Sequence, residues 1–371
     1  MYLKPFAMER FQSIWENVVD YNLSESGIHP FQLYEILTKE DLNDLAFTSL
    51  GYNQTNGSVE LRATIADLYQ GASVENILVT TGSAEANFLS TWCLIEPGDV
   101  LALMLPNYMQ IWGIAGAFGA QVEPFYLVTK NERWQIDWEE FENAVSSKTK
   151  VIAICNPNNP TGAQLTQDEI KKICNIAAQM NAWILSDEVY RGAERIGDIT
   201  STFWGQYDKV IAVGGLSKAY GLPGLRIGWI VAPPDLVEKL WSYHDYTTIC
   251  PNPLSDRLAR VALSLPNREK ILERTRKIVR TNFKILEDWL NSHDGVFDCI
   301  PPIAGAITLV KYNLNIKSLE LVTRLRKEKS VLVVPGEHFF MENYFRFGFG
   351  SPSDYLQRAL NRIGELISEI Q

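Results

Sequence analysis

The chain has 371 residues, of which 46% are hydrophobic and 21% are charged, and its formal net charge is −10 at pH 7. This composition is typical of a globular protein long enough for two domains. The negative charge opposes a broad phosphate-binding surface, so we expect no nucleic-acid partner. No stretch approaches the roughly 20 apolar residues of a membrane span, and we expect no membrane association.

The cysteines, the histidines and the first residues point to a cytoplasmic location and to no metal. Glu9 and Glu16 lie where a signal peptide needs an unbroken apolar core. The five cysteines are dispersed and form no CxxC pair, which is typical of reduced thiols. The four histidines lie far apart, and none has the spacing of a zinc ligand, so we predict no metal site.

Short apolar strands alternate with amphipathic helices from about residue 76 to residue 217. We predict strands at 76–82, 99–106, 150–155, 182–190 and 208–217, and helices at 83–95, 109–119 and 166–180. The last of these helices begins with a capping box, in which Glu169 follows Thr166 by three residues. Buried strands separated by helices predict an α/β fold with a mostly parallel sheet covered by helices on both faces.

The pattern changes after about residue 253. A long charged amphipathic helix is predicted at 268–292, and strands are predicted at 305–314, 330–336 and 344–350 with helices between and after them. These elements indicate a smaller α+β domain. We assign 45–255 to the large domain, and 1–44 together with 256–371 to an N-terminal arm and the small domain.

Distinctive segments follow the predicted strands, and in an open parallel sheet ligands bind beyond the carboxyl ends of the strands. Gly82, Ser83 and Ala84 form a strand-to-helix turn, whose free amides and small side chains suit a phosphate, although a plain turn has the same pattern. The segment NPNNPTG at 156–162 can hold Asn159 rigidly, so that its amide donates to a phenolate-like oxygen. A tight surface turn is the alternative for this segment.

Asp187 and Tyr190 follow the next strand. A carboxylate at this place can keep a heteroaromatic nitrogen protonated, and the tyrosine hydroxyl can donate to the same ligand. Taken alone, Asp187 is also a good helix N-cap.

The segment GGLSKAYGLPGLRIGW at 214–229 places Lys218 just after another strand. A phosphate-binding P-loop lysine follows GxxxxG and precedes Ser or Thr, whereas Lys218 follows Ser217 and precedes Ala219. A lysine at a strand end near a phosphate site instead suits a Schiff base with an aldehyde cofactor. Arg226 can then bind the phosphate in a bidentate pair, although a buried arginine often forms a structural ion pair.

These motifs together are similar to those of fold-type I pyridoxal-phosphate enzymes of the class I and II aminotransferase family, from about residue 22 to the end of the chain. The resemblance implies pyridoxal 5'-phosphate as the cofactor, an α-amino acid as the substrate, and a seven-stranded type of sheet in the large domain. It also implies the cofactor-binding residues, which are Gly82, Ser83, Ala84, Asn159, Asp187, Tyr190, Ser217, Lys218 and Arg226.

Further positions match the family where the motifs align. Tyr52 in GYNQTNGSVELR matches a tyrosine that reaches the phosphate of the neighbouring subunit, which implies a homodimer. Tyr108 in LPNYMQIW matches the aromatic residue that stacks on the pyridine ring, and Arg346 in YFRFGFG matches the arginine that binds the substrate α-carboxylate. Many members carry Ser or Thr where this chain has Gly215, so Ser217 is the candidate to replace that hydroxyl.

The segment NLSESGIHPFQLYEI departs from the usual L-x-x-G-x-P segment of the family, in which a glycine amide meets the substrate carboxylate. It resembles the N-terminal segment of the cyclising members, capreomycidine synthase and L-enduracididine cyclase, although a lineage-specific variant of an ordinary transaminase is the alternative. The resemblance implies Ser26, Gly27 and His29 as substrate-binding residues. His29 is also the predicted catalytic proton donor, and Glu9 or Glu25 would hold a guanidinium.

The cyclase interpretation predicts a hydroxylated L-arginine as the substrate. Lys218 removes the Cα proton, the hydroxyl leaves as water, and a guanidine nitrogen adds to the resulting alkene and closes a ring. An ordinary aminotransferase that passes the amino group to a 2-oxo acid is the alternative. A ligand-sensing regulatory module of the same fold is a remote one, because no basic DNA-binding segment precedes Tyr52.

Overall fold

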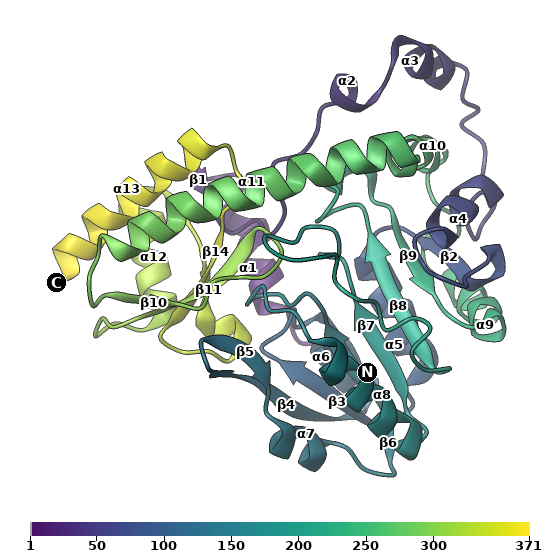
Figure 1. Cartoon of the computed structure of the whole chain (residues 1–371), viewed down its shortest axis with the longest axis horizontal. Helices are drawn as coiled ribbons and strands as arrows, with labels where there is room; N and C mark the ends of the chain where they lie inside the picture. The colour runs from purple at the N-terminus through teal and green to yellow at the C-terminus, as the bar shows by residue number, and fades with distance from the viewer. Residues whose placement is uncertain (1) are drawn as a thin grey trace.

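The structure is a computed structural model that describes residues 2–371, and a large, mostly parallel sheet occupies its centre (Figure 1). Within the described residues this sheet has eight strands, in the order β2 (Ile77–Thr80), β9 (Gly228–Val231), β8 (Val210–Gly215), β7 (Trp183–Asp187), β6 (Thr149–Cys155), β3 (Val100–Leu105), β4 (Gln121–Lys130) and β5 (Arg133–Ile136). The strands from β8 to β4 run parallel, whereas β9 and β5 are antiparallel to their neighbours. The predicted α/β fold is confirmed, and β5 adds a strand beyond the seven-stranded expectation.

Helices cover both faces of this sheet, because its central strands are apolar on both sides. One face packs against the helices α5 (Ser83–Leu94), α6 (Gln110–Ala117) and α9 (Pro234–His244). The other face packs against α4 (Val59–Ala66), α7 (Trp138–Ala144), α8 (Gln167–Met180) and α10 (Pro253–Leu263). The predicted capping box of α8 is present, with the Thr166 and Glu169 side chains each accepting from the other residue's amide.

A second hydrophobic core lies around an antiparallel sheet with the strand order β10 (Phe297–Cys299), β11 (Ile307–Tyr312), β14 (Tyr344–Gly348) and β13 (Val334–Pro335). The helices α12 (Ser318–Lys329) and α13 (Ser353–Ile370) pack against it, together with the second half of α11 (Leu265–Asn291). Figure 1 shows that α11 extends along the whole molecule from one core to the other. The predicted domain boundary at 255 falls inside α10.

The N-terminal segment joins the second core. After α1 (Ala7–Trp15), the strand β1 (Tyr21–Asn22) pairs in parallel with β12 (Val331–Leu332), and Leu23 and Ile28 are buried in that core. The chain then continues through α2 (Leu33–Ile36), whose Ile36 packs against the first core, and through α3 (Lys39–Ala46), which stands apart from both cores in Figure 1. Within residues 2–371, no helix combines the length and the apolar character needed to cross a membrane.

Candidate active site

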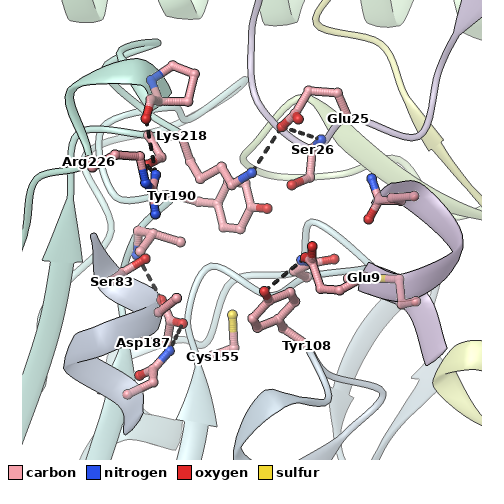
Figure 2. Close-up of a pocket in the computed structure, with 18 of the residues that line it drawn as sticks. Glu9, Glu25, Ser26, Ser83, Tyr108, Cys155, Asp187, Tyr190, Lys218 and Arg226 are labelled. Carbon is pink, nitrogen blue, oxygen red and sulfur yellow. Dashed lines mark hydrogen bonds and ion pairs between the residues drawn. The ribbon is translucent and has the colours of Figure 1, made fainter. Parts of the chain in front are cut away.

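The carboxyl ends of the central strands meet at one edge of the large sheet. Cys155 at the end of β6 is in register with Asp187 at the end of β7, and Asp187 is in register with Val213 of β8. A cavity of about 320 Å³ lies at this edge, and Figure 2 shows the side chains that surround it. Its lining contains most of the predicted site residues, namely Glu9, Ser26, Ser83, Ala84, Tyr108, Asn159, Asp187, Tyr190, Ser217, Lys218 and Arg226.

The turn between β2 and α5 forms a cradle, a concave backbone surface beside Arg226. At two positions of this surface, Gly82 and Gly228, a side chain larger than that of glycine would collide with its neighbours. Gly82, the N-cap of α5, has φ of 82°, and a β-carbon on it would collide with the guanidinium of Arg226. A β-carbon on Gly228 of β9 would collide with Gly82 and with the backbone nitrogen of Ser83. The first amides of α5 and the positive end of its dipole therefore face the cavity beside Arg226, an arrangement that suits a phosphate.

Ser217, the candidate to replace the hydroxyl that Gly215 lacks, lines the cavity next to Arg226. Arg226 adopts a left-handed conformation with φ of 50°, and its Nη1 donates to the Pro223 carbonyl at 3.1 Å and to Ser217 Oγ at 3.4 Å. Gly215 brings its backbone close to the Ser83 side chain, so a larger residue there would narrow the cradle. Ser217 is therefore placed to contribute a hydroxyl to the same group as Arg226.

Asp187 is buried, and its carboxylate is held in a fixed orientation. Asn87 of α5 donates its Nδ2 to Asp187 Oδ2 at 2.9 Å, and the Val189 amide donates to Asp187 Oδ1 at 3.3 Å. Burial raises the pKa of Asp187, whereas these hydrogen bonds and Lys218 lower it. The ionised form of a buried carboxylate is stabilised by a cationic partner, and a protonated pyridine nitrogen would be such a partner. The sequence analysis did not predict Asn87 as a site residue. Its position one turn after Ser83, on the helix that faces the cavity, could have indicated it.

Tyr190 presents an unpaired hydroxyl to the cavity. The residue is buried, its Oη has no hydrogen-bond partner within residues 2–371, and burial raises its pKa to about 12. A buried hydroxyl that keeps its proton and lacks a partner is ready to donate to a ligand oxygen. The orphaned hydroxyl, the glycine cradle and the buried Asp187 carboxylate fit pyridoxal phosphate at its ring oxygen, phosphate and ring nitrogen.

Tyr108 forms the opposite wall of the cavity. Its hydroxyl donates to Glu9 Oε1 at 2.9 Å, and its ring packs edge-on against Phe6 with centroids 5.0 Å apart (Figure 2). Burial and Glu9 raise the pKa of Tyr108 well above its usual value. The ring is thus fixed from both sides, as a stacking partner of a flat ligand requires.

Lys218 projects from the loop after β8 and meets Glu25. Its Nζ lies 3.0 Å from Glu25 Oε1, and the same oxygen accepts from the amides of Ser26 and Gly27, each at 2.9 Å. The Lys218 ammonium lowers the pKa of Glu25 to about 2. The Gly27 amide, predicted to meet the substrate, instead binds a carboxylate of the chain itself.

Arg346 is fully buried next to the cavity. Its Nη1 donates to Asn159 Oδ1 at 2.9 Å, its Nη2 donates to the Ser24 carbonyl, and the sulfur of Met8 covers it at 3.6 Å from Nη1. Its Nε has no hydrogen-bond partner in the described part of the chain. Burial lowers the pKa of Arg346, and the surrounding acidic groups Tyr190, Glu25, Glu9 and Tyr108 raise it. The unpartnered Nε is therefore a donor that suits a carboxylate.

One face of α1 lines the cavity and makes it acidic, which the sequence pattern indicated only at Glu9. Met8, Glu9 and Gln12 of α1 border it, as does Glu16, the C-cap of this helix. Gln12 Nε2 fixes the helix to the following loop by donating to the Ser24 carbonyl at 2.8 Å. Burial raises the pKa of Glu16, and the neighbouring carboxylates of Glu25 and Glu9 raise it further. Each of these positions is one or two turns from another on a single helix face.

The structure places His29 and Tyr52 outside the cavity. His29 is absent from the lining among the described residues, because its Nδ1 lies 2.9 Å from the Gly350 carbonyl and its ring packs toward that loop. The geometry therefore gives no support to His29 as a proton donor or as a substrate-binding residue. Tyr52 is 88% exposed on the far side of the segment that contains α3, so its predicted contact needs a second chain.

Two further residues that border the cavity were missed from the sequence. Cys155 lies at the end of β6, and burial raises the pKa of its thiol well above the usual value, so it stays protonated. Val189 lies between Asp187 and Tyr190 and adds an apolar wall. Neither carries a motif, and only the strand-end position could have indicated them.

Comparison with known proteins shows the family to which the chain is similar. The family model of class I and class II aminotransferases matches residues 27–363 of this chain. Capreomycidine synthase from Streptomyces vinaceus is 30% identical over 351 residues, which cover 93% of this chain and 89% of that enzyme. An aspartate aminotransferase from Sulfurisphaera tokodaii is 28% identical over 369 residues, which cover 94% of this chain and 90% of that enzyme.

A solved structure is similar over the full length. The structure of a PLP-dependent aminotransferase from Streptococcus suis superposes with a TM-score of 0.94 at 33% identity, covering 100% of this chain and 99% of the other. The similarity extends over both cores and over the N-terminal segment that carries Glu9 and Glu25.

Proposed function

We propose a specific activity for this chain, which belongs to the class I and II aminotransferase family and is an enzyme that uses pyridoxal phosphate. It converts a hydroxylated L-arginine to a cyclic guanidine amino acid of the enduracididine or capreomycidine type. The observation that carries the proposal is the acidic face of α1, where Glu9 and Glu16 border the same cavity as Lys218.

The charge of the cavity supports a cationic substrate side chain. Arg346 matches the arginine that binds the substrate α-carboxylate in the family, and it contacts Asn159 of the cavity. Glu9 and Glu16 line the same cavity. The carboxylate of either residue can form a forked pair with a planar guanidinium. An aspartate side chain would instead be repelled there. The 30% identity to capreomycidine synthase supports the same substrate class.

The roles of the residues follow from their positions. The bound cofactor withdraws electrons from Cα of the substrate. Asp187 would hold a proton at the ring nitrogen, Tyr190 would donate to the ring oxygen, and Lys218 takes the proton from Cα and returns it to a leaving hydroxyl. Arg346 would fix the α-carboxylate, and Met8 of α1 packs against its guanidinium.

One incubation tests the proposal. The holoenzyme is mixed with 3-hydroxyarginine or 4-hydroxyarginine without any 2-oxo acid, and product masses are followed over time. We expect loss of one water with the α-nitrogen retained. A stoichiometric keto acid, with the amino group left on the cofactor, would refute the cyclase and establish an aminotransferase.

An ordinary aminotransferase is the second candidate, and the 33% identity to the Streptococcus suis protein favours it. The same Lys218 would then return the proton to the cofactor instead of to a leaving group. The acidic face of α1 would still select a basic amino acid. Adding several 2-oxo acids to the incubation above detects this activity directly.

We also propose a homodimer in the cytoplasm. The segment from 31 to 55 exposes Leu33, Tyr34, Phe47, Leu50 and Tyr52, an apolar surface that a second copy could cover. All five cysteines are free, which suits a reducing compartment.

A further inference from the structure

We propose that Glu25 is a positioning residue for Lys218: its carboxylate holds the lysine amino group in the cavity and keeps on the enzyme the proton that the lysine has taken. The pair is direct, with 3.0 Å between Glu25 Oε1 and Lys218 Nζ. In Figure 2 the two side chains approach each other across the cavity from the N-terminal loop and from the loop after β8.

The carboxylate is preorganised by its own loop. The amides of Ser26 and Gly27 both donate to Oε1 at 2.9 Å, so the backbone fixes the orientation of the side chain. A β-carbon on Gly27 would lie 3.3 Å from the Ser217 carbonyl, so glycine lets this loop approach the lysine loop closely. A fixed carboxylate orients a flexible lysine at little entropic cost, because only one of the two partners must be ordered.

These contacts also separate the roles of the acidic residues. One oxygen of Glu25 already accepts from two amides and from Lys218. A forked pair with a substrate guanidinium needs both carboxylate oxygens, so it would have to compete with all three donors at Oε1, whereas Glu16 makes no such contacts with Lys218. Guanidinium binding is therefore assigned to α1, and Glu25 is assigned to the lysine.

The charges around Lys218 agree with this role. Burial lowers the pKa of Lys218 and so does Arg346, whereas Glu25 and Tyr190 raise it, and the balance lies above the usual lysine value. Glu25 itself stays ionised near neutral pH, because Lys218 and the Gly27 amide lower its pKa to about 2. An ionised carboxylate at this distance favours the ammonium form of the lysine.

The consequence for the reaction rests on the proposed function. In its amine form Lys218 takes the Cα proton, and it thereby becomes an ammonium ion beside Glu25. For a Cβ hydroxyl, the electron pair of the Cα–H bond forms the C=C bond as the C–O bond breaks. The ammonium proton leaves with the oxygen as water, and the lysine is an amine again. Glu25 makes the proton stay on Lys218 until the hydroxyl takes it.

The pairing itself is tested without any substrate. The full chain, freed of cofactor, is acetylated briefly across a pH series, and labelling of Lys218 is read by peptide mass. In Glu25→Gln the labelling midpoint should fall by about one pH unit or more, because an opposite charge nearby shifts a pKa by about 1–3 units. Glu25→Asp, which keeps the charge, should recover part of the shift. Lys209, at the opposite end of β8, is the internal reference.

An unchanged Lys218 midpoint in Glu25→Gln would overturn the proposal. If that variant does not fold, the wild-type protein provides the test. A pH midpoint of Lys218 acetylation that is lower in the folded chain than in the urea-unfolded chain would also overturn the proposal. The holoenzyme gives a second readout, since Glu25→Gln should move the acid limb of Cα hydrogen exchange to lower pH. A failed cyclase assay with these shifts intact would refute only the proposed function.

Discussion

We expect single side chains to carry the chemistry of this site. The surrounding fold either holds their polar atoms with hydrogen bonds or leaves those atoms without a hydrogen-bond partner. Asp187 receives two hydrogen bonds that set its orientation, and Tyr190 has a hydroxyl with no partner within residues 2–371. Both are buried, so their interactions with a ligand are not weakened by water. Losing either group should therefore change a rate far more than it changes folding.

Asp187→Asn should retain the cofactor and lose catalysis. The amide keeps the shape but carries no charge, so it no longer holds a proton on the ring nitrogen and the electron withdrawal weakens. We expect Cα hydrogen exchange to fall by about two orders of magnitude or more. Near wild-type exchange, with cofactor content checked by absorbance, would show that Asp187 does not pair with the nitrogen.

Glu16→Gln should weaken binding of guanidine substrates selectively. A hydrogen bond to a charged group contributes about 1.5–3 kcal/mol, so KM for hydroxyarginine should rise about tenfold or more. The neutral urea analogue, hydroxycitrulline, lacks the charge and should show little change in KM. Equal effects on both substrates would place the guanidinium elsewhere.

At the scale of elements, the sequence predicted what rests on local pattern. The parallel strands β3, β6, β7 and β8, the long helix α11 and the capping box at Thr166 follow from periodicity and from capping chemistry, whereas the strands β4 and β9 were not predicted. The hairpin that adds β5 was missed, because Arg133–Ile136 is short and turns at Asn131 and Glu132 with positive φ instead of at glycine.

The candidate site also contains residues that local pattern could predict and contacts that it could not. Residues at strand ends were predictable because topology brings them together, as with Asp187 and Lys218. The contacts of Asn87 and of Glu25 were not, because they join segments far apart in the chain and carry no motif. His29 was misplaced for the same reason: only tertiary packing turns its ring toward Gly350.

The start of α5 makes a prediction about acid stability. Burial raises the pKa of Glu85, but hydrogen bonds from His244, Thr247 and the Thr81 amide lower it to about 2. Because the folded pKa lies below the ordinary value of 4.5, the stabilisation is complete above pH 4.5. It is lost as pH falls toward 2.

Glu85→Gln should therefore be less stable than wild type at pH 7, by about 1–3 kcal/mol for a lost charged hydrogen bond. The difference should shrink as pH falls from 4.5 to 3. Urea unfolding at each pH measures it. A difference that is constant over this range would mean that the carboxylate charge is not the stabilising feature.

At the scale of the whole molecule, two cores share one cavity. The cavity takes residues from the large sheet edge, from α1 and from the loop with Glu25, while α11 runs between the cores. Tyr52 is exposed and does not line the cavity of its own chain. A phosphate contact from Tyr52 is then possible only in the site of a partner.

Mixing two inactive variants should restore activity if sites are shared in this way. In a hybrid of Lys218→Ala with Tyr52→Ala, one site carries both changes and the other carries neither. Random reassociation should recover about a quarter of wild-type activity, since half of the dimers are hybrids with one intact site. Each variant unfolded and refolded alone is the control. No recovery, or a fully active monomer in sedimentation, would contradict the shared site.

The position of Met8 over Arg346 has a consequence for how substrates are told apart. The same helix that covers the arginine also presents Glu9, and Glu16 follows its last residue, so one segment of the chain contacts both the carboxylate end and the far end of a bound substrate. A neutral amino acid can reach Arg346 but gains nothing from the acidic wall. We expect its turnover number to fall together with its affinity, because binding energy at the remote end is what keeps the reacting carbon aligned with the lysine.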